Sequence, residues 1–218
     1  MVRVMDLAYT YRDPTRLYLN ATNRCTNRCS FCVRFRVDGL GGAVLRGEAE
    51  PDLEGLLAAV EGLGGPAAYR EIIWCGFGEP TFRLDLIVAA APRLRIGQAR
   101  IRLNTNGHAC LIHGRDVLPE LSGAVDEVSV SLNAPSCARY LELCRPTSEA
   151  LPGGIPRPTG ASTGDERFWH ATVEFLRRAP ACFDRVQASV VGIALSAEEI
   201  EETRELALSL GAHRFRVR

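Results

Sequence analysis

The chain has 218 residues, of which 46% are hydrophobic and 24% are charged, as in an ordinary globular domain and unlike a disordered or fibrous chain. The formal net charge is zero, so composition gives no general attraction to nucleic acid or to an acidic membrane surface. The 26 basic residues are all arginine, which excludes a lysine Schiff base and a lysine general base.

The N-terminal stretch and the cysteine content bear on location. Residues 1–20 are polar and lack the apolar core of a signal peptide, and no run of about 18 apolar residues predicts a membrane span. The 8 cysteines, in a reducing compartment, indicate metal binding or buried thiols and not disulfides. We therefore expect a single domain over residues 1–218, located in the cytoplasm and not in a membrane.

Strands and helices alternate along the chain. In order, the sequence predicts a strand at 17–22, a helix at 51–64, a strand at 70–75, a helix at 82–91, a strand at 99–104, a helix at 115–121, a strand at 127–132, helices at 135–143 and 166–178, a strand at 185–191, a helix at 196–210 and a strand at 214–217. Pro92 is expected to stop the second helix. Ser196 and Glu199 form a capping-box pattern at the start of the last one. Residues 145–164 carry 4 prolines and 4 glycines, which predicts a long flexible loop or a substrate lid.

Repeated βα units imply a parallel sheet covered by helices, which places the chain in the α/β class. Five of the predicted strands alternate apolar and polar residues, as in Val128, Val130 and Leu132 against Ser129 and Ser131. Parallel strands buried on both faces are normally apolar throughout. The alternation therefore favours a curved or barrel-like sheet with a polar interior, a ligand-binding architecture. An edge or solvent-facing sheet is the alternative.

The most informative segment is the run Cys25-x3-Cys29-x2-Cys32. Three thiolates on one loop can hold one metal centre, whereas structural zinc and ordinary iron–sulfur sites usually have four protein ligands. Such a site either borrows a distant ligand or leaves a coordination position open for a small molecule. A zinc site completed by another residue and an accidental spacing both remain open on this evidence.

Further polar motifs follow three of the predicted strands. Gly76-Phe77-Gly78-Glu79-Pro80 follows the second strand, and there small residues would permit close backbone approach while Glu79 supplies a carboxylate for a cation. The third and fourth strands end in short polar side chains, namely Thr105 and Asn106, and Ser131 and Asn133. The C-terminal ends of parallel strands are where α/β folds bind ligands. Each motif alone is also compatible with a simple turn.

Together these motifs resemble the radical S-adenosylmethionine (radical SAM) superfamily. The resemblance implies a partial (β/α)6 TIM-like barrel and two cofactors, a [4Fe–4S] cluster and S-adenosylmethionine (SAM), with Cys25, Cys29 and Cys32 ligating three irons and the open iron chelating SAM. The implied SAM-binding residues are Phe31 near the adenine, Gly76, Gly78 and Glu79 near the methionine, and Thr105, Asn106, Ser131 and Asn133 near other polar groups. Phe77 stands where the family usually has glycine.

The phrases NRCTNRCSFC, CGFGEPTFRLD, RLNTNG, LIHGRD, SVSLNAP and LCRP are similar to those of the TatD-nuclease-associated radical SAM family. That name describes an association with a metal-dependent nuclease and implies no particular reaction or substrate.

The expected activity is reductive cleavage of SAM to a 5′-deoxyadenosyl radical that abstracts hydrogen from an unidentified substrate. The resemblance implies an electron donor such as flavodoxin or ferredoxin. Arg216 and Arg218 are candidate substrate anchors because arginine binds carboxylate or phosphate in a bidentate manner, and no catalytic residue is assigned. The alternatives are an activating enzyme for a partner protein, an enzyme that modifies a nucleic acid or nucleoside, which the neutral charge does not indicate, and a non-catalytic three-cysteine metal-binding module.

Overall fold

The computed structural model of the protein describes residues 5–47, 49–151 and 165–218. The chain forms two compact units. Unit 1 comprises the described residues of Met1–Arg24, Val33–Asn104 and Pro119–Glu127, and unit 2 those of Cys25–Cys32, Thr105–Leu118 and Val128–Arg218. The boundary falls one residue inside strand β6 (Arg100–Thr105), helix α4 (Leu118–Ala124) and strand β7 (Glu127–Ser131). The prediction of a single domain stays a prediction, and most of the predicted flexible loop, residues 152–164, lies outside the described residues.

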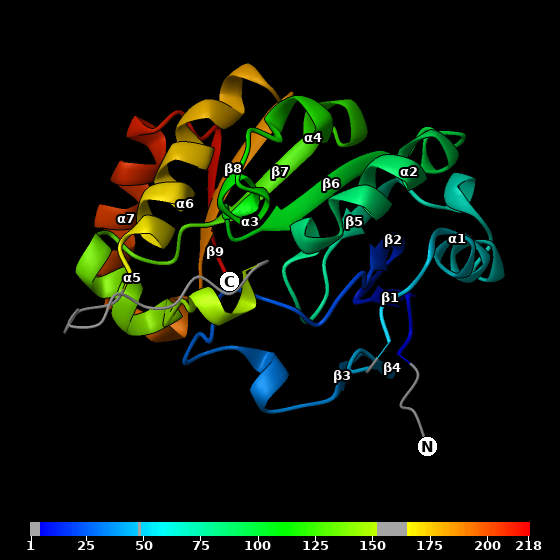
Figure 1. Ribbon diagram of the computed structural model, residues 1–218, viewed down its shortest axis with the longest axis horizontal. Helices are drawn as coiled ribbons and strands as arrows, with labels where there is room; N and C mark the ends of the chain where they lie inside the picture. Colours follow the sequence, from blue (N-terminus) through cyan, green and yellow to red (C-terminus); the bar gives the residue numbers. More distant parts are fainter. Residues whose placement is uncertain (1–4, 48, 152–164) are drawn as a thin grey trace. The chain divides into compact units, whose positions relative to one another are not determined.

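Unit 1 is built on parallel strands with one antiparallel edge strand, drawn in blue to green in Figure 1. In sheet order its strands are β1 (Ala8–Tyr11), β2 (Asp13–Leu19), β5 (Glu71–Trp74) and β6 (Arg100–Thr105). β1 runs antiparallel to β2, whereas β2, β5 and β6 are parallel to one another. A two-stranded hairpin, β3 (Gly39–Leu40) and β4 (Ala43–Val44), forms in the glycine-rich segment that follows the cysteine loop in sequence.

The register of these strands separates an apolar face from a polar one. Leu19, Trp74 and Leu103 are paired across the sheet, and all three are fully buried. On the opposite face Arg102 is also buried, and its guanidinium lies 3.3 Å from the carboxylate of Glu71 and 3.9 Å from that of Glu127. The alternation in the sequence therefore does mark a buried polar face in unit 1, but Arg102 is neutralised there by carboxylates of the protein itself.

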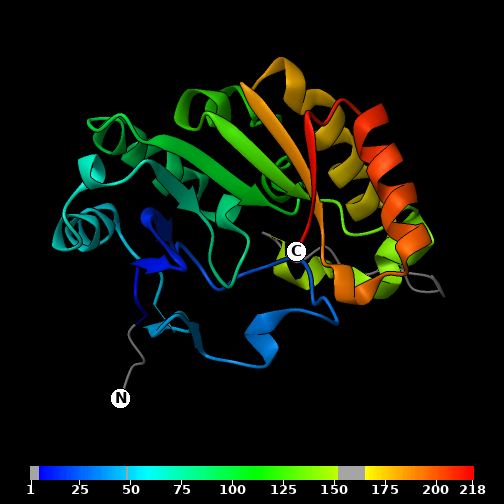
Figure 2. The same cartoon turned by 180° about the vertical axis from the view of Figure 1, so that it is seen from behind.

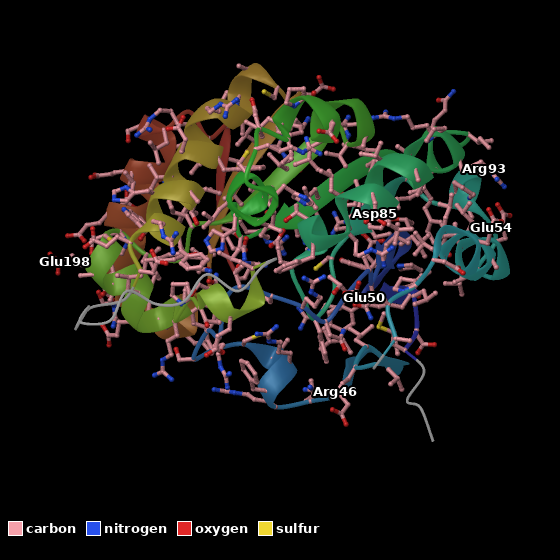
Figure 3. The ribbon with its side chains drawn as sticks, in the orientation of Figure 1. Arg46, Glu50, Glu54, Asp85, Arg93 and Glu198 are labelled. Carbon is pink, nitrogen blue, oxygen red and sulfur yellow. The ribbon has the colours of Figure 1, made fainter. Side chains whose placement is uncertain are left out.

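The longer helices of unit 1 are α1 (Leu53–Gly62) and α2 (Leu84–Leu94), which lie on the same side of its strands in Figures 1 and 2. α4 (Leu118–Ala124) and the 3-10 turns η1 (Val33–Phe35), η2 (Pro66–Ala68) and η3 (Pro80–Arg83) complete it. Each long helix buries most of its leucines, while charged residues such as Glu54 and Arg93 lie on the outer side (Figure 3).

Unit 2 contains three strands, which alternate with helices along the chain. Its strands are, in sheet order, β7 (Glu127–Ser131), β8 (Arg185–Val190) and β9 (Arg214–Val217), with β8 parallel to β9. Its helices are α3 (Ala109–His113), α5 (Cys137–Cys144), α6 (Arg167–Arg178) and α7 (Ala197–Ser209), with the 3-10 turns η4 (Ser148–Ala150), η5 (Ala179–Ala181) and η6 (Gly192–Ala194). α6 contacts both α3 and α5, and α7 contacts β8 and β9.

Several predicted elements need correction. The first strand begins at Asp13 and ends at Leu19, so the predicted residues 20–22 lie beyond it. The short strand β1 and the single-turn helix α3 were not predicted, since four or five residues carry too little periodicity. Pro92 does not stop α2, which runs to Leu94. Proline there removes one hydrogen bond near the helix end, and the fully buried Leu94 offsets that loss.

Other features of the prediction are confirmed. β9 has the predicted bounds, and α7 begins with a complete capping box, in which Ser196 accepts from the backbone of Glu199 and the Glu199 side chain accepts from the backbone of Ser196. In the described part of the chain, no helix is long and apolar enough to cross a membrane.

His108 lies in unit 2, and its side chain is fully buried, with an exposed fraction of 0%. Burial lowers its pKa from 6.5 to about 3, because the charged imidazolium would lose its hydration, although the nearby backbone of Phe168 opposes the shift. The folded protein therefore holds His108 neutral at every pH at which the chain is expected to work.

This pKa shift predicts a pH dependence of stability. Between pH 6.5 and about 3 the unfolded chain binds a proton at His108 and the folded protein does not, so stability present above pH 6.5 is lost as the pH falls. In urea unfolding of the metal-free protein between pH 6.5 and 4.5, we expect His108→Gln to make the slope of unfolding free energy against pH shallower by about 1 kcal/mol per pH unit. His170→Gln, at an exposed histidine, is the control and should keep the wild-type slope. Equal slopes in all three proteins would contradict the assignment.

Candidate functional site

The three cysteines of the 25–32 loop belong to unit 2, and each is half-buried and outside any disulfide. Within the described residues, no three His, Cys, Asp or Glu side chains converge on a point where they could share one metal ion. A cluster does not require such convergence, because each cysteine then binds its own iron. Partly accessible cysteine sulfurs on a single loop are the donor set that an iron–sulfur cluster needs.

The backbone of this loop is fixed by the end of α5 and the residues after it. The amide of Arg28 donates to the carbonyl of Cys144 at 2.9 Å, and the amide of Ser30 donates to the carbonyl of Leu143 at 2.9 Å. Helix C-terminal carbonyls have no partner within their own helix, so the loop supplies the donors they lack. The amide of Thr147 donates to the carbonyl of Thr26 at 2.8 Å, and Asn27 forms an antiparallel bridge with Pro146. The described start of the predicted flexible loop is therefore engaged with the cysteine loop.

A buried polar cluster lies behind the loop, within unit 2, and the sequence did not reveal it. The hydroxyl of Thr26 lies 2.7 Å from Nδ1 of His108, and Nε2 of His108 lies 2.9 Å from the hydroxyl of Tyr140. The amide of Asn27 donates to the same Tyr140 hydroxyl at 3.1 Å. The one sequence signal for this cluster is that His108 lies two residues after the predicted SAM-binding residue Asn106.

Two predicted SAM-binding residues, Thr105 and Asn106, lie in this unit and are buried. Thr105 accepts from the amide of Gly107 at 3.0 Å, as in an ordinary polar turn. Asn106 accepts from the amide of His108 at 3.0 Å and donates to the hydroxyl of Thr26 at 2.9 Å. Its amide also lies 4.0 Å from the sulfur of Cys25. Asn106 therefore contacts the cysteine loop directly.

Asn133 has the properties expected of a ligand-binding residue. It is 4% exposed, and its φ of 62° lies in the left-handed region, which few non-glycine residues adopt. Its amide nitrogen donates to the sulfur of Cys144 at 3.8 Å, but its Oδ1 is buried without any hydrogen-bond partner among the described residues. An orphaned buried acceptor is costly, and a ligand donor at this strand end would satisfy it.

The remaining predicted residues of unit 2 lie nearer the surface. Ser131 is half-buried and accepts from the guanidinium of Arg218 at 2.9 Å, while Arg216 and Arg218 are both exposed. Arg216 pairs in register with the buried Ser189, which places it on the polar face of these strands. Phe31 is half-buried.

The predicted motif at residues 76–80 lies in unit 1, where it packs against the segment that leads to the cysteine loop. A Cβ added to Gly78 would lie 2.4 Å from the carbonyl oxygen of Arg24 and 2.5 Å from that of Thr22, and one added to Gly76 would lie 2.1 Å from Oδ1 of Asn20. The amide of Glu79 donates to the carbonyl of Arg24 at 2.7 Å. These glycines make room for the chain itself, whereas the sequence suggested that they make room for a ligand.

Glu79 is 3% exposed, and its Oε1 accepts from the amide of Thr81 at 3.3 Å and from the Thr81 hydroxyl at 2.8 Å. The carboxylate thereby caps the N-terminus of η3, a favourable place for negative charge. A fixed, buried carboxylate at this position has the charge needed to hold an ammonium group.

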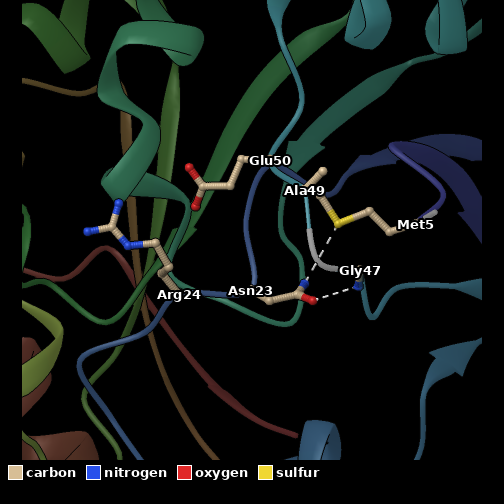
Figure 4. Close-up of a pocket in the computed structure, with 6 residues that line it drawn as sticks. All are labelled: Met5, Asn23, Arg24, Gly47, Ala49 and Glu50. Atoms are coloured by element: carbon tan, nitrogen blue, oxygen red, sulfur yellow. Dashed lines mark hydrogen bonds between the residues drawn. The ribbon is translucent and has the colours of Figure 1, made fainter. Parts of the chain in front are cut away.

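Unit 1 also contains a cavity of about 340 Å³ beside the residues that precede Cys25. It is lined by Met5, Asn23, Arg24, Gly47, Ala49 and Glu50 (Figure 4). Asn23 forms one wall, since its Oδ1 accepts from the amide of Gly47 at 2.8 Å. Arg24 stacks on the ring of Phe82 at 4.4 Å, which orients its guanidinium.

Comparison with known proteins gives the family. A family model described as the radical SAM superfamily matches residues 19–207, and a comparison with curated proteins gave no match. Among solved structures, Streptococcus suis SuiB bound to the precursor peptide SuiA is similar with a TM-score of 0.62 and 16% identity, over 94% of this chain and 39% of SuiB. SuiB bound to S-adenosylmethionine gives 0.59 and 18%, over 94% of this chain and 38% of that one. Archaeal TYW1 gives 0.53 and 11%, over 96% and 66%.

These identities are too low to show more than a shared fold, and this chain spans about two fifths of the length of SuiB. They confirm the predicted α/β fold with parallel strands, and the described strands form no closed barrel, as expected of a partial one. The family match covers most of the chain. The chain therefore belongs to the radical SAM superfamily, and its cofactors are a [4Fe–4S] cluster and S-adenosylmethionine.

Proposed function

We propose that the chain is a radical SAM enzyme in which Cys25, Cys29 and Cys32 hold the cluster and SAM occupies the remaining iron. The observation that carries the proposal is the loop of three half-buried cysteines within a family match to residues 19–207. When bound, the reduced cluster supplies one electron to the sulfonium of SAM, which yields methionine and a 5′-deoxyadenosyl radical that abstracts hydrogen from the substrate.

The residues of the chain would bind and orient SAM. Glu79 supplies a buried, fixed carboxylate suited to an ammonium group, and Gly76 and Gly78 set the backbone that positions it. The orphaned Oδ1 of Asn133 is an acceptor for a ligand hydroxyl or amine. Thr105, Asn106, Ser131 and Phe31 complete the proposed set, with Asn106 acting chiefly on the cysteine loop.

The source of electrons and the substrate follow as further parts of the proposal. A small one-electron protein such as flavodoxin or ferredoxin would reduce the cluster in the cytoplasm, where the eight cysteines would remain reduced. Arg216 and Arg218, exposed at β9, would anchor an acidic group of the substrate.

For the substrate, an untargeted comparison of metabolites, peptides and modified nucleosides in cells with and without the protein is the deciding experiment. A protein substrate would indicate an activating enzyme, and a modified nucleoside would indicate the nucleic-acid alternative. We also propose membership of the TatD-nuclease-associated group, supported by the phrases around the cysteines and strand ends. A genome in which no TatD-type nuclease gene lies nearby would count against it.

The general reaction predicts that anaerobically reconstituted, reduced protein converts SAM to 5′-deoxyadenosine and methionine. Cys29→Ala removes one iron ligand and should reduce the yield to the level of a protein-free control, because the cluster is no longer held. Cys182→Ala, at a half-buried cysteine distant in sequence from the loop, is the matched control and should retain the yield. No product from wild type, or equal product from Cys29→Ala, would overturn the proposal. Zinc without sulfide in the purified protein would favour the binding-module alternative.

The role given to Asn133 predicts a loss of SAM affinity without loss of fold. Asn133→Gly keeps the left-handed backbone unstrained and removes the orphaned oxygen, so SAM binding should weaken by about tenfold, the value of one good hydrogen bond. Equilibrium dialysis of SAM against reconstituted protein measures this. Arg145→Gly, at an exposed residue with a φ of 46°, controls for the glycine itself and should bind SAM as wild type does. An unchanged dissociation constant for Asn133→Gly would remove Asn133 from the site.

A further inference from the structure

Five buried residues of unit 2 form a closed cycle of hydrogen bonds behind the cysteine loop. In order around the cycle they are Asn106, Thr26, His108, Tyr140 and Thr172. The successive heavy-atom distances are 2.9, 2.7, 2.9 and 3.4 Å, and the cycle closes where the Thr172 hydroxyl donates to the carbonyl of Asn106 at 2.9 Å. None of the five is more than 7% exposed, so water does not compete for these bonds.

The donors and acceptors around His108 are consistent with one tautomer of its ring. Oδ1 of Asn106 accepts from the amide of His108, so the amide nitrogen faces Thr26 and can only donate. The Thr26 hydroxyl, which accepts from Asn106, has its own hydrogen left for Nδ1 of His108. Nδ1 is then an acceptor, and the ring proton of neutral His108 lies on Nε2 and points at Tyr140.

The Tyr140 hydroxyl completes the assignment. It accepts from Nε2 of His108 and from the amide of Asn27, and the Thr172 hydroxyl lies 3.4 Å away as a further donor to it. The Thr172 hydroxyl also lies within donating distance of the carbonyl of Asn106, at 2.9 Å, and of the carbonyl of Phe168 in its own helix, at 3.1 Å. A proton on Nδ1 would face the Thr26 hydrogen and break the cycle at its shortest bond.

The cycle acts on the metal-binding loop because two of the residues it holds lie between Cys25 and Cys29. Thr26 is a member of the cycle, and Asn27 is bound to Tyr140. Both side chains are buried, at 0% and 3% exposure. The loop has no regular secondary structure of its own, so these side chains supply the anchors that a strand or helix would otherwise give.

We propose that His108, as the neutral Nε2–H tautomer, is a positioning residue that fixes the cysteine loop for cluster binding through Thr26 and Tyr140. The hydrogen bonds run from His108 to the loop through Thr26 and through Tyr140 with Asn27. This inference rests on the proposed function, in that the loop is taken to hold a cluster. Groups that orient metal ligands from behind commonly contribute 10- to 100-fold to metal affinity.

Thr26→Val and Thr26→Ser test the proposal, because valine keeps the shape of threonine and removes the hydroxyl while serine keeps the hydroxyl. The three proteins are reconstituted anaerobically with iron and sulfide, and iron release to an excess of chelator is followed. We expect release to be at least about tenfold faster in Thr26→Val and within about twofold of wild type in Thr26→Ser. Thr203→Val removes another fully buried threonine hydroxyl of unit 2, far from the loop in sequence, and should behave as wild type.

The tautomer has an independent readout. In the ¹⁵N spectrum of histidine-labelled protein, assigned with His108→Gln, the His108 ring should show a protonated Nε2 and an unprotonated Nδ1 at neutral pH. Tyr140→Phe, which removes the acceptor of Nε2–H, should shift that signal and also speed iron release. The spectrum depends on His108→Gln for its assignment and not on Thr26→Val, so it decides the matter even if Thr26→Val does not fold.

Equal iron release from Thr26→Val and wild type, or a proton on Nδ1, would overturn the proposal. The failure of the proposed function looks different, because then wild type itself would take up no cluster or would form no 5′-deoxyadenosine. The two outcomes are therefore separable in one set of samples.

Discussion

The structure of the candidate site depends on how an eight-residue loop with no hydrogen-bond ladder of its own is held in one conformation. In unit 2 the loop is held by hydrogen bonds to the end of α5 and to the buried polar cluster around His108. The amides of Arg28 and Ser30 satisfy the terminal carbonyls of α5, and the side chains of Thr26 and Asn27 reach His108 and Tyr140. Fixing such a loop costs about 1–2 kcal/mol of backbone entropy per residue, so bonds protected from water are needed to hold it.

Several residues that the sequence suggests for ligand binding serve first to build this support. Asn106 uses both ends of its amide on His108 and Thr26, and Gly78 allows the carbonyls of Thr22 and Arg24 to approach where any Cβ would collide. In unit 1 the Glu79 amide is bound to Arg24, the residue immediately before Cys25 in the chain. Residues of the family motifs thus hold the protein chain near the cysteines, a supporting role that ligand chemistry alone would not suggest.

What could be predicted from the sequence is what local pattern and composition determine. The capping box at Ser196 and the strand β9 depend on neighbouring residues, and the spacing of the three cysteines is visible directly. The short elements β1 and α3 could not be predicted, because tertiary contacts and not periodicity stabilise them. The cluster around His108 could not be predicted because its members are far apart in the sequence. His108 lies 82 positions from Thr26 and 32 from Tyr140, and only the fold brings such residues together.

Asn133 shows that a ligand-binding residue can be recognised from features that destabilise the ligand-free fold. A left-handed backbone at a non-glycine residue and a buried acceptor without a partner each disfavour the folded state, by about 1–3 kcal/mol apiece. Both occur at one residue, at the end of β7, where parallel α/β folds bind their ligands. Asn tolerates this backbone region better than other non-glycine residues, and its amide keeps a bond to Cys144. Oδ1 of Asn133 has no hydrogen-bond partner in the described protein. The free-energy cost of burying it is therefore offset only when a ligand donor binds it.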